Sequence, residues 1–424
     1  MDGMIEVPDM SQLLGFVPTA QYGDTLDAGR PCDVPADLPC ADRAARGGAL
    51  HLSSVLPALA DAIGAPVSTA VHADGARLRR ALGFPQARSA VVVLVDGLGY
   101  WNLALRIGHA PYLRSLLRDS VNRRPICTTS PSTTTAALAA FGTGTCPGLT
   151  CMTGYTQRNP ATDELAQLIA FRNAPSPESL QREPTVFELL AARDVPVTSV
   201  GLSRFAFSPF TRAALRGSRY ICADTPRDRV RKAAHACAQP GLAYLYLRDV
   251  DKTGHANGWD GEDWVAAVEK VDGQLATLRR LLPQGTLMVI VADHGMVESD
   301  PSARIDVASD PALMQGVHML AGEPRSMMVY VEEGQEVQDV ADRWRGRLAG
   351  RAWVRTRQEA VDAGFFGPMG RQAWDTVGDL VVEAAGAVTL VDSAHQSEGA
   401  MLLPGVHGSQ TMMEMDIPCL VDMA

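Results

Sequence analysis

Residues 90–97 read Ala-Val-Val-Val-Leu-Val-Asp-Gly, an unbroken apolar run that ends at a carboxylate and a glycine. A strand that faces solvent on one side alternates apolar and polar residues, whereas a strand covered on both faces does not. The run therefore predicts a central strand with helices on both faces of its sheet. In such sheets ligands bind beyond the carboxyl ends of the strands, so Asp96 stands where a functional residue is expected.

On either side of this run, apolar segments alternate with patterns of helical spacing. The further candidate strands are Val197–Leu202, Leu242–Leu247, Leu287–Val291 and, more weakly, Leu380–Val382. The candidate helices include Thr134–Phe141, Thr185–Ala192, Arg227–Cys237 and Gly261–Leu282. This alternation predicts an α/β fold with a mainly parallel central sheet covered by helices on both faces. We expect an irregular N-terminal arm over residues 1–50 and a single catalytic domain over residues 51–424.

Composition narrows the class of protein. The chain has 424 residues, of which 46% are hydrophobic and 20% charged, which is ordinary globular usage and excludes a disordered protein. The net charge of −10 argues against binding to a nucleic-acid polymer or an anionic membrane. Because we find no signal peptide and no membrane-spanning run, we expect a cytoplasmic protein that acts on a small molecule. The eight cysteines form no Cys-x-x-Cys pair and are expected to be free thiols. The oligomeric state is not predicted.

Four polar clusters lie at or near the expected strand ends. Their candidate metal ligands are three aspartates and three histidines: Asp96, Asp251, His255, Asp293, His294 and His407. Each cluster alone has a plain structural explanation, such as a turn after a strand. Together they are the right number for two metal sites of three protein ligands each, which is the pattern of catalytic zinc. Two such ions about 4 Å apart stabilise the attacking and leaving oxygens of a phosphoryl displacement.

A nucleophile for that chemistry is offered by the hydroxyl-rich segment Cys127–Thr135. Such a run is also typical of a polar turn that ends in a helix N-cap. Thr134 opens the Ala-rich segment Ala136–Ala140, so its hydroxyl is expected beside the positive end of a helix dipole. Thr134 can be both the nucleophile and a residue at the start of a helix.

The order of these motifs resembles the alkaline phosphatase superfamily and, within it, the type I nucleotide pyrophosphatase/phosphodiesterase family. The resemblance is carried by Val95-Asp96-Gly97, Pro131-Ser132-Thr133-Thr134 with Thr143-Gly144, Asp251-Lys252-Thr253-Gly254-His255, Asp293-His294-Gly295-Met296 and His407-Gly408. It implies two zinc ions per chain and a covalent phosphothreonine intermediate on Thr134. The implied ligands of one ion are Asp251, His255 and His407, and those of the other are Asp96, Asp293 and His294. The implied substrate is a small phosphodiester or a nucleotide.

Three positions depart from the family pattern. The aromatic residue that often follows the nucleophile is Thr135, an asparagine three residues after the nucleophile is Ala137, and a downstream asparagine aligns with Tyr155. These changes leave the metal ligands intact and put nucleotide recognition in question. Candidate substrate-contacting residues are Tyr155, Phe205 and Phe210, together with His318 and Arg325, which flank a loop before the strand Met327–Val331.

Alternatives remain at this stage. A phosphomonoesterase or a phosphonate hydrolase of the same superfamily would use the same metals. A monoester dianion needs extra positive charge, and no arginine follows Thr134 within ten residues, which favours a diester. A sulfatase lacks support because no Cys-x-Pro-x-Arg segment stands at the nucleophile. A phosphoglycerate mutase-like isomerase shares the metal scaffold, and a non-catalytic binding module would have no need of all seven residues.

Overall fold

The computed structural model describes residues 5–23 and 46–424. Strand β1 (Ser89–Val95) is buried along its whole length and pairs in parallel with β7 (Gly241–Leu247) on one side and β8 (Thr286–Val291) on the other. The six-stranded sheet has the order β18-β8-β1-β7-β5-β6. Its remaining strands are β5 (Val197–Gly201), β6 (Arg219–Cys222) and β18 (Cys419–Met423). Only β18 runs antiparallel to its neighbour, so the prediction of a mainly parallel sheet is confirmed.

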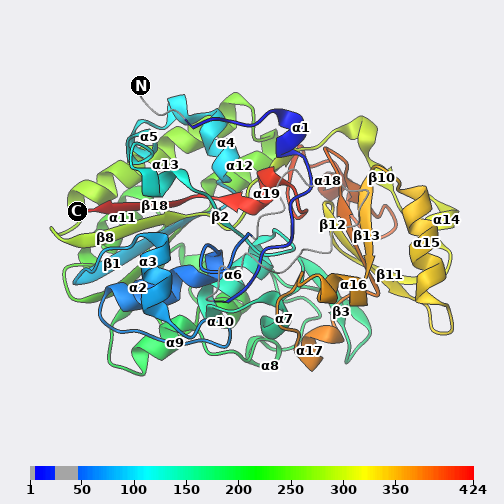
Figure 1. The fold of residues 1–424 in the computed structure, drawn as a ribbon, viewed down its shortest axis with the longest axis horizontal. Helices are drawn as coiled ribbons and strands as arrows, with labels where there is room; N and C mark the ends of the chain where they lie inside the picture. Colours follow the sequence, from blue (N-terminus) through cyan, green and yellow to red (C-terminus); the bar gives the residue numbers. More distant parts are fainter. Residues whose placement is uncertain (1–4, 24–45) are drawn as a thin grey trace.

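Helices cover both faces of this sheet (Figure 1). One face carries α11 (Pro226–Ala236), α12 (Asp249–Asn257) and α13 (Glu262–Leu281), and the other carries α2 (Val55–Ala62), α3 (Gly75–Leu82), α6 (Thr134–Thr143) and α9 (Val186–Ala191). The apolar side chains of β1 and β8 are completely buried, because apolar helix faces pack on them from both sides. Strands that are buried on both faces are apolar throughout, which explains the continuous apolar runs of β1 and β8 in the sequence.

A second sheet forms the other lobe of the molecule (Figure 1). It is antiparallel, with the order β11-β12-β14-β13, and consists of β11 (Val317–Glu323), β12 (Ser326–Val331), β13 (Ala352–Thr356) and β14 (Leu380–Ala384). Helix α15 (Val337–Arg347) covers one face through the buried ring of Trp344. The prediction that Leu380–Val382 continues the parallel alternation is therefore wrong. This segment lies in the second sheet, where its apolar side chains face two separate small cores.

The remaining elements are short. The small ladders are β2 (Ile126–Cys127) with β17 (Asp416–Ile417), β3 (Thr156–Asn159) with β4 (Glu164–Gln167), β9 (Val297–Glu298) with β16 (Gly405–Val406), and β10 (Ile305–Asp306) with β15 (Leu390–Val391). The short helices are α1 (Met10–Leu13), α4 (Tyr100–Leu105), α5 (Pro111–Leu116), α7 (Pro147–Thr150), α8 (Pro177–Leu180), α10 (Pro209–Ala214), α14 (Pro311–Met314), α16 (Arg357–Asp362), α17 (Arg371–Trp374), α18 (Glu398–Met401) and α19 (Met412–Met415).

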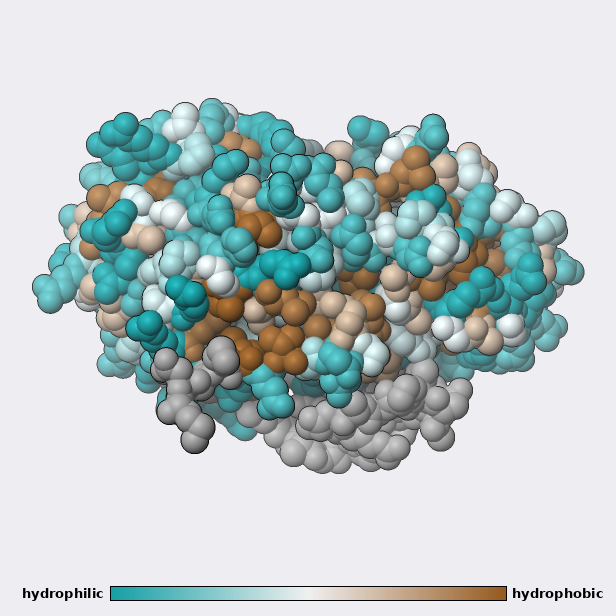
Figure 2. Space-filling view, turned by 90° about the horizontal axis from the view of Figure 1, so that it is seen from above, coloured by the Kyte–Doolittle hydropathy of each residue, from teal (hydrophilic) through white to brown (hydrophobic). Residues whose placement is uncertain are grey.

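The surface is mainly hydrophilic. Hydrophilic residues cover most of the face shown in Figure 2, and hydrophobic residues gather near its middle. No helix among the described residues is both long and apolar enough to cross a bilayer. The cysteines of the described part are free thiols, whereas Cys32 and Cys40 lie outside it, as does most of the arm expected over residues 1–50.

Candidate active site

Three adjacent strands bring the predicted metal ligands to one edge of the large sheet. Asp96 follows β1, Asp251 lies in the first turn of α12 after β7, and Asp293 follows β8. The backbone N–H of Asp251 donates to the carbonyl of Asp96 (3.1 Å), which joins two of these strand ends directly. In parallel sheets, ligands bind beyond the carboxyl ends of the strands. Three neighbouring strands of this chain carry candidate metal ligands at those ends.

Gly97 allows this close approach. Its φ of +71° is unfavourable for any residue with a Cβ, and a Cβ at this position would lie 2.8 Å from the Cβ of Asp251. Its backbone N–H donates to Oδ1 of Asp293 (3.1 Å). One glycine thus lets α12 approach β1 and at the same time orients a carboxylate of the third strand.

The first ligand cluster contains Asp96, Asp293 and His294. Nε2 of His294 lies 3.5 Å from Oδ1 of Asp96 and 3.6 Å from Oδ2 of Asp293. All three side chains are buried, and burial lowers the pKa of His294 to about 4, so its ring is neutral. These donor atoms are close enough together to ligate one ion.

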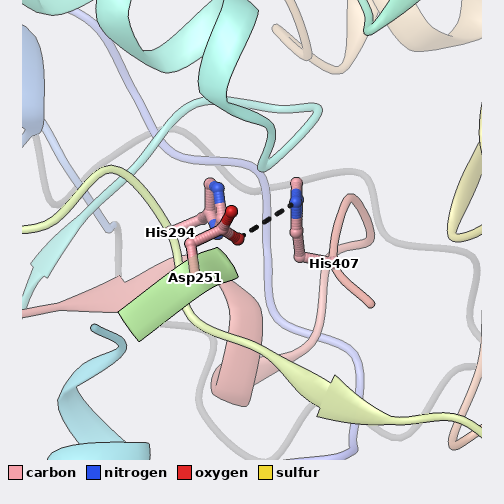
Figure 3. Close-up of side chains that lie close together, drawn as sticks. All are labelled: Asp251, His294 and His407. Atoms are coloured by element: carbon pink, nitrogen blue, oxygen red, sulfur yellow. Dashed lines mark ion pairs between the residues drawn. The ribbon is translucent and has the colours of Figure 1, made fainter. Parts of the chain in front are cut away.

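The second cluster contains Asp251, His255 and His407. Nε2 of His255 lies 3.2 Å from Oδ1 of Asp251 and 3.2 Å from Nε2 of His407. Oδ1 of Asp251 is 3.9 Å from Nε2 of His407. His294 joins the two clusters, because its ring stacks on that of His407 with centroids 3.6 Å apart, and it also lies within ligating range of Asp251 (Figure 3).

The three histidines share one hydrogen-bond pattern. In each ring, Nδ1 lies close to a backbone carbonyl oxygen: 3.1 Å from Gly295 for His294, 2.8 Å from Gly405 for His255, and 2.9 Å from Ser132 for His407. A carbonyl oxygen only accepts, so Nδ1 carries the hydrogen and Nε2 presents a lone pair to the cluster. Metal-binding histidines are oriented in this way by their second nitrogen.

The carboxylates of the site lack the partners that buried charges need. Oδ1 of Asp96, Oδ1 of Asp251 and Oδ2 of Asp293 are buried without a hydrogen-bond donor among the described residues. Burial and the neighbouring carboxylates raise the pKa of Asp251 and of Asp293 to about 7, and that of Asp96 well above its usual range. Unpaired buried carboxylates are costly unless a cation compensates them. Oxygen and imidazole donors without a thiolate fit one or two zinc-like ions.

Thr134 is the hydroxyl that faces these clusters. It begins α6, and its Oγ1 lies 3.1 Å from Nε2 of His294. Two of the neighbouring hydroxyls are directed elsewhere: Ser132 donates to the carbonyl of Ser409 (2.8 Å) and Thr135 to that of Gly154 (2.7 Å). At the first turn of a helix, free backbone N–H groups favour a nearby anionic group.

A cleft of about 1060 Å³ opens in front of Thr134 and the metal ligands. Tyr155, Phe205 and Phe210 line it, as the sequence analysis expects of substrate-contacting residues. The Tyr246 hydroxyl donates to Oδ2 of Asp96, and its ring packs edge-on against Phe205 with centroids 6.0 Å apart. An aromatic wall therefore extends from the metal ligands into the cleft.

Residues 90–410 match the sequence model of the type I phosphodiesterase/nucleotide pyrophosphatase family, a span that contains Thr134 and all the candidate ligands. The chain belongs to this family. A comparison with curated proteins found no significant match.

Solved structures of the alkaline phosphatase superfamily share the fold. Murine ectonucleotide pyrophosphatase/phosphodiesterase 5 is similar with a TM-score of 0.62 at 16% identity, over 78% of this chain and 87% of that one. Phosphonoacetate hydrolase from Sinorhizobium meliloti 1021 is similar with a TM-score of 0.58 at 20% identity, over 80% of this chain and 90% of that one. The human form of the first enzyme gives a TM-score of 0.58 at 14% identity, over 78% and 87%.

The departures from the phosphodiesterase family pattern are explained by packing. Thr135 is buried and bonded to Gly154, and Ala137 is buried inside α6, so neither contacts a ligand. Tyr155 keeps a place in the cleft, where its hydroxyl accepts a hydrogen bond from Gln167 (3.1 Å). The residue directly after Thr134 therefore offers no stacking surface to the cleft.

The position of Arg325 contradicts the prediction that it contacts substrate. Its side chain is completely buried, and its guanidinium donates to both carboxylate oxygens of Glu414 (3.1 and 2.8 Å). Glu414 in turn accepts from the backbone N–H of Ser409 (2.9 Å), so Arg325 supports the loop that follows His407. His318 also lies outside the cleft lining and pairs with Asp163 (2.9 Å).

Sequence reasoning missed several residues of the cleft. Tyr246 and Arg248 flank the end of β7, where the strand-end rule was a usable signal. Glu323, Arg172 and Arg204 also line the cleft. They come from the second sheet and from surface loops, and no local pattern connects those segments with the metal ligands.

Proposed function

We propose that this chain is a two-zinc phosphodiesterase or nucleotide pyrophosphatase that forms a covalent phosphothreonine on Thr134. The observation that carries this proposal is the position of the Thr134 hydroxyl, 3.1 Å from Nε2 of His294 at the junction of the two ligand clusters. Folding alone does not require a hydroxyl at the start of a helix to lie beside unpaired buried carboxylates.

The donor set determines which metal is expected. Asp251, His255 and His407 would hold one ion, and Asp96, Asp293 and His294 the other. Three imidazoles and three carboxylates suit zinc better than magnesium, which prefers oxygen ligands and retained water. When bound, the ions supply the positive charge that stabilises the alkoxide and the charge developing on the phosphoryl oxygens.

The chain's own residues position the reaction. The Thr134 hydroxyl gives up its proton to solvent water in the cleft, and its Oγ1 forms a bond to phosphorus while the bond from phosphorus to the leaving oxygen breaks in line. The leaving oxygen takes a proton from solvent in the open cleft. Backbone N–H groups at the start of α6 lie where they stabilise phosphoryl oxygens. Water then cleaves the phosphothreonine ester and restores the hydroxyl.

Family membership favours a diester or pyrophosphate substrate. The family contains nucleotide pyrophosphatases, and one structure of the murine relative is described as an inactive form in complex with AMP. Arg325, named above as a candidate for substrate contact, is held by Glu414 and does not line the cleft.

A comparison of two aryl phosphates tests the proposal. The zinc-loaded protein should hydrolyse bis-p-nitrophenyl phosphate with a higher kcat/KM than p-nitrophenyl phosphate. A matched phosphonate substrate provides the third arm. A clear preference for the monoester or for the phosphonate would replace the proposal with a phosphomonoesterase or a phosphonate hydrolase using the same residues.

A further inference from the structure

Three arginines line the cleft that also contains Thr134 and the candidate metal ligands: Arg172, Arg204 and Arg248. Arg172 and Arg204 are exposed and Arg248 is half-buried, and within residues 5–23 and 46–424 no carboxylate forms an ion pair with any of them. The chain as a whole has a net charge of −10, so three arginines around one cleft form a local positive charge in an acidic protein. That local charge favours an anionic ligand group in addition to the phosphate at Thr134.

Arg248 lies at the carboxyl end of β7. It follows β7 and precedes α12, three residues before Asp251, and it is half-buried. The adjacent Asp249 is 3.6 Å from the guanidinium of Arg229, so the nearest carboxylate in sequence is already engaged. The positive charge of Arg248 is therefore available to the cleft.

Arg204 is held at the cleft by an anchored turn. Ser203 donates to Asp224 through its backbone N–H (2.9 Å) and its hydroxyl (2.6 Å), which occupies both carboxylate oxygens. The guanidinium of Arg204 lies over the Phe205 ring, 4.8 Å from its centroid. Phe205 contacts Tyr246, whose hydroxyl reaches Asp96, so a continuous row of contacts links Arg204 to the metal site.

Arg172 lies in a conformationally unusual loop. The residues on either side, Phe171 and Asn173, both have a φ of +53°, which is rare for a phenylalanine. Backbone hydrogen bonds in both directions between Gln167 and Arg172 (3.0 and 3.1 Å) hold the turn. Strain of this kind persists where the surrounding structure over-determines it and is concentrated at ligand sites.

The acidic side chains of the cleft leave these arginines free. Asp96 and Asp251 belong to the ligand clusters, and Asp392 binds His395 (2.8 Å). Glu323 is buried, and one of its carboxylate oxygens lies 3.9 Å from Nδ1 of His407. None of these four carboxylates forms an ion pair with Arg172, Arg204 or Arg248.

We propose that Arg172, Arg204 and Arg248 form a second anion subsite, which selects phosphodiesters or pyrophosphates that carry a further phosphate or carboxylate group. This inference rests on the proposed function, because the first anion is the phosphate at Thr134. Guanidinium groups match the planar or tetrahedral oxyanions of both chemistries through paired N–H donors. The aromatic wall of Phe205 and Tyr246 separates the two anions and contacts the part of the substrate between them.

Competitive inhibition tests whether this subsite binds an anion, and the result does not depend on which group leaves the phosphorus. With methyl p-nitrophenyl phosphate as substrate, inhibition constants are compared for methylphosphonate, butane bisphosphonate and carboxypropyl phosphonate. We expect the doubly anionic probes to bind the wild type about tenfold more tightly than methylphosphonate. That preference should fall about threefold in Arg172→Ala, Arg204→Ala or Arg248→Ala, and disappear in the triple variant. The two doubly anionic probes distinguish a phosphate from a carboxylate partner.

The controls separate this inference from the proposed function. Arg280→Ala, which removes an exposed arginine of α13 outside the cleft, should keep the wild-type preference. Chelation of zinc by the probes is the same for every variant, so a change in the ratio reports the arginines. If the preference is equal in the wild type and the triple variant, the second subsite is disproved. If methyl p-nitrophenyl phosphate is not hydrolysed at all, the proposed function itself fails.

Discussion

Nε2 of His255 lies 3.2 Å from Nε2 of His407, although each ring places the hydrogen on its other nitrogen. Two lone pairs at this distance repel each other unless a cation lies between them. Two nitrogen ligands of a tetrahedral zinc ion, each about 2.05 Å from the metal, are about 3.3 Å apart. The pair is therefore already spaced for a shared ion, and it stands on two segments about 150 residues apart in sequence.

Metal content follows from this spacing. Purified active protein should contain about two zinc ions per chain by elemental analysis, and chelation should abolish hydrolysis. His407→Ala and Asp96→Asn should each lower the zinc content toward one ion, because they belong to different clusters. Combining them should reduce kcat little more than either alone, since the ligands act as a unit. Active protein that contains only magnesium or manganese would contradict the assignment.

The buried pair of Arg325 and Glu414 predicts a defect in stability and metal binding. Arg325→Ala leaves Glu414 buried without its cation, which costs about 3–5 kcal/mol of unfolding free energy. Because Glu414 also holds Ser409, the variant should bind zinc more weakly at the site of His407. Urea unfolding and zinc titration measure the two effects. Arg347→Ala breaks an exposed ion pair with Asp310 and should cost less than about 1 kcal/mol. A raised KM with unchanged stability would instead indicate that Arg325 contacts substrate.

Glu383 predicts a pH dependence of stability. It is completely buried in the second sheet, and burial raises its pKa to about 8, despite a hydrogen bond from Ser326 (2.5 Å). Between its ordinary pKa near 4.5 and about 8, the folded state keeps a proton that the unfolded state has released. Stability contributed by this group therefore falls as pH rises through that window, by at most about 1.4 kcal/mol per pH unit.

Glu383→Gln should remove that slope. Unfolding free energies of the wild type and the variant, measured from about pH 5 to about pH 8.5, should converge at the acid end and diverge at the alkaline end, where the variant is the more stable. Glu333→Gln changes an exposed glutamate of the same lobe and should run parallel to the wild type. Parallel curves for Glu383→Gln as well would show that Glu383 ionises normally.

The large sheet could be predicted because strands that are buried on both faces are apolar along their whole length. The runs at Ala90–Val95 and Leu287–Val291 are apolar throughout, and their ends carry the ligands that the topology gathers. His255 was also predictable, since it lies one helical turn after Asp251. These features depend on local pattern and one topological rule.

The features that could not be predicted depend on contacts between residues that are far apart in the sequence. Arg325 and Glu414 are 89 residues apart, and no local pattern shows that the guanidinium turns inward rather than toward the cleft. The second sheet is antiparallel and partly exposed, so β13 shows no continuous apolar run. Arg172 and Arg204 lie in loops whose position relative to Thr134 depends on the whole fold.

Thr134 itself provides the most decisive prediction. Thr134→Ala should keep both metal ions and the fold yet reduce kcat by about a thousandfold or more, because the nucleophilic oxygen is lost. Thr134→Ser should retain substantial activity, since it keeps the oxygen beside His294. Thr135→Ala provides the neighbouring control: its hydroxyl bonds Gly154 and faces away from the cluster, so the variant should mainly lose about 1 kcal/mol of stability.

Trapping the intermediate locates the nucleophile directly. Wild-type protein mixed with substrate and quenched in acid should carry a phosphate on the peptide that contains Thr134, and fragmentation should assign it to that residue. Ser132 and Thr135 donate their hydroxyl hydrogens to carbonyls of other segments, so their oxygens face away from the ligand clusters. A phosphate on Ser132 or Thr135 would therefore disprove both the assignment and the geometry on which it rests, and a phosphate on Thr133 would disprove the assignment to Thr134.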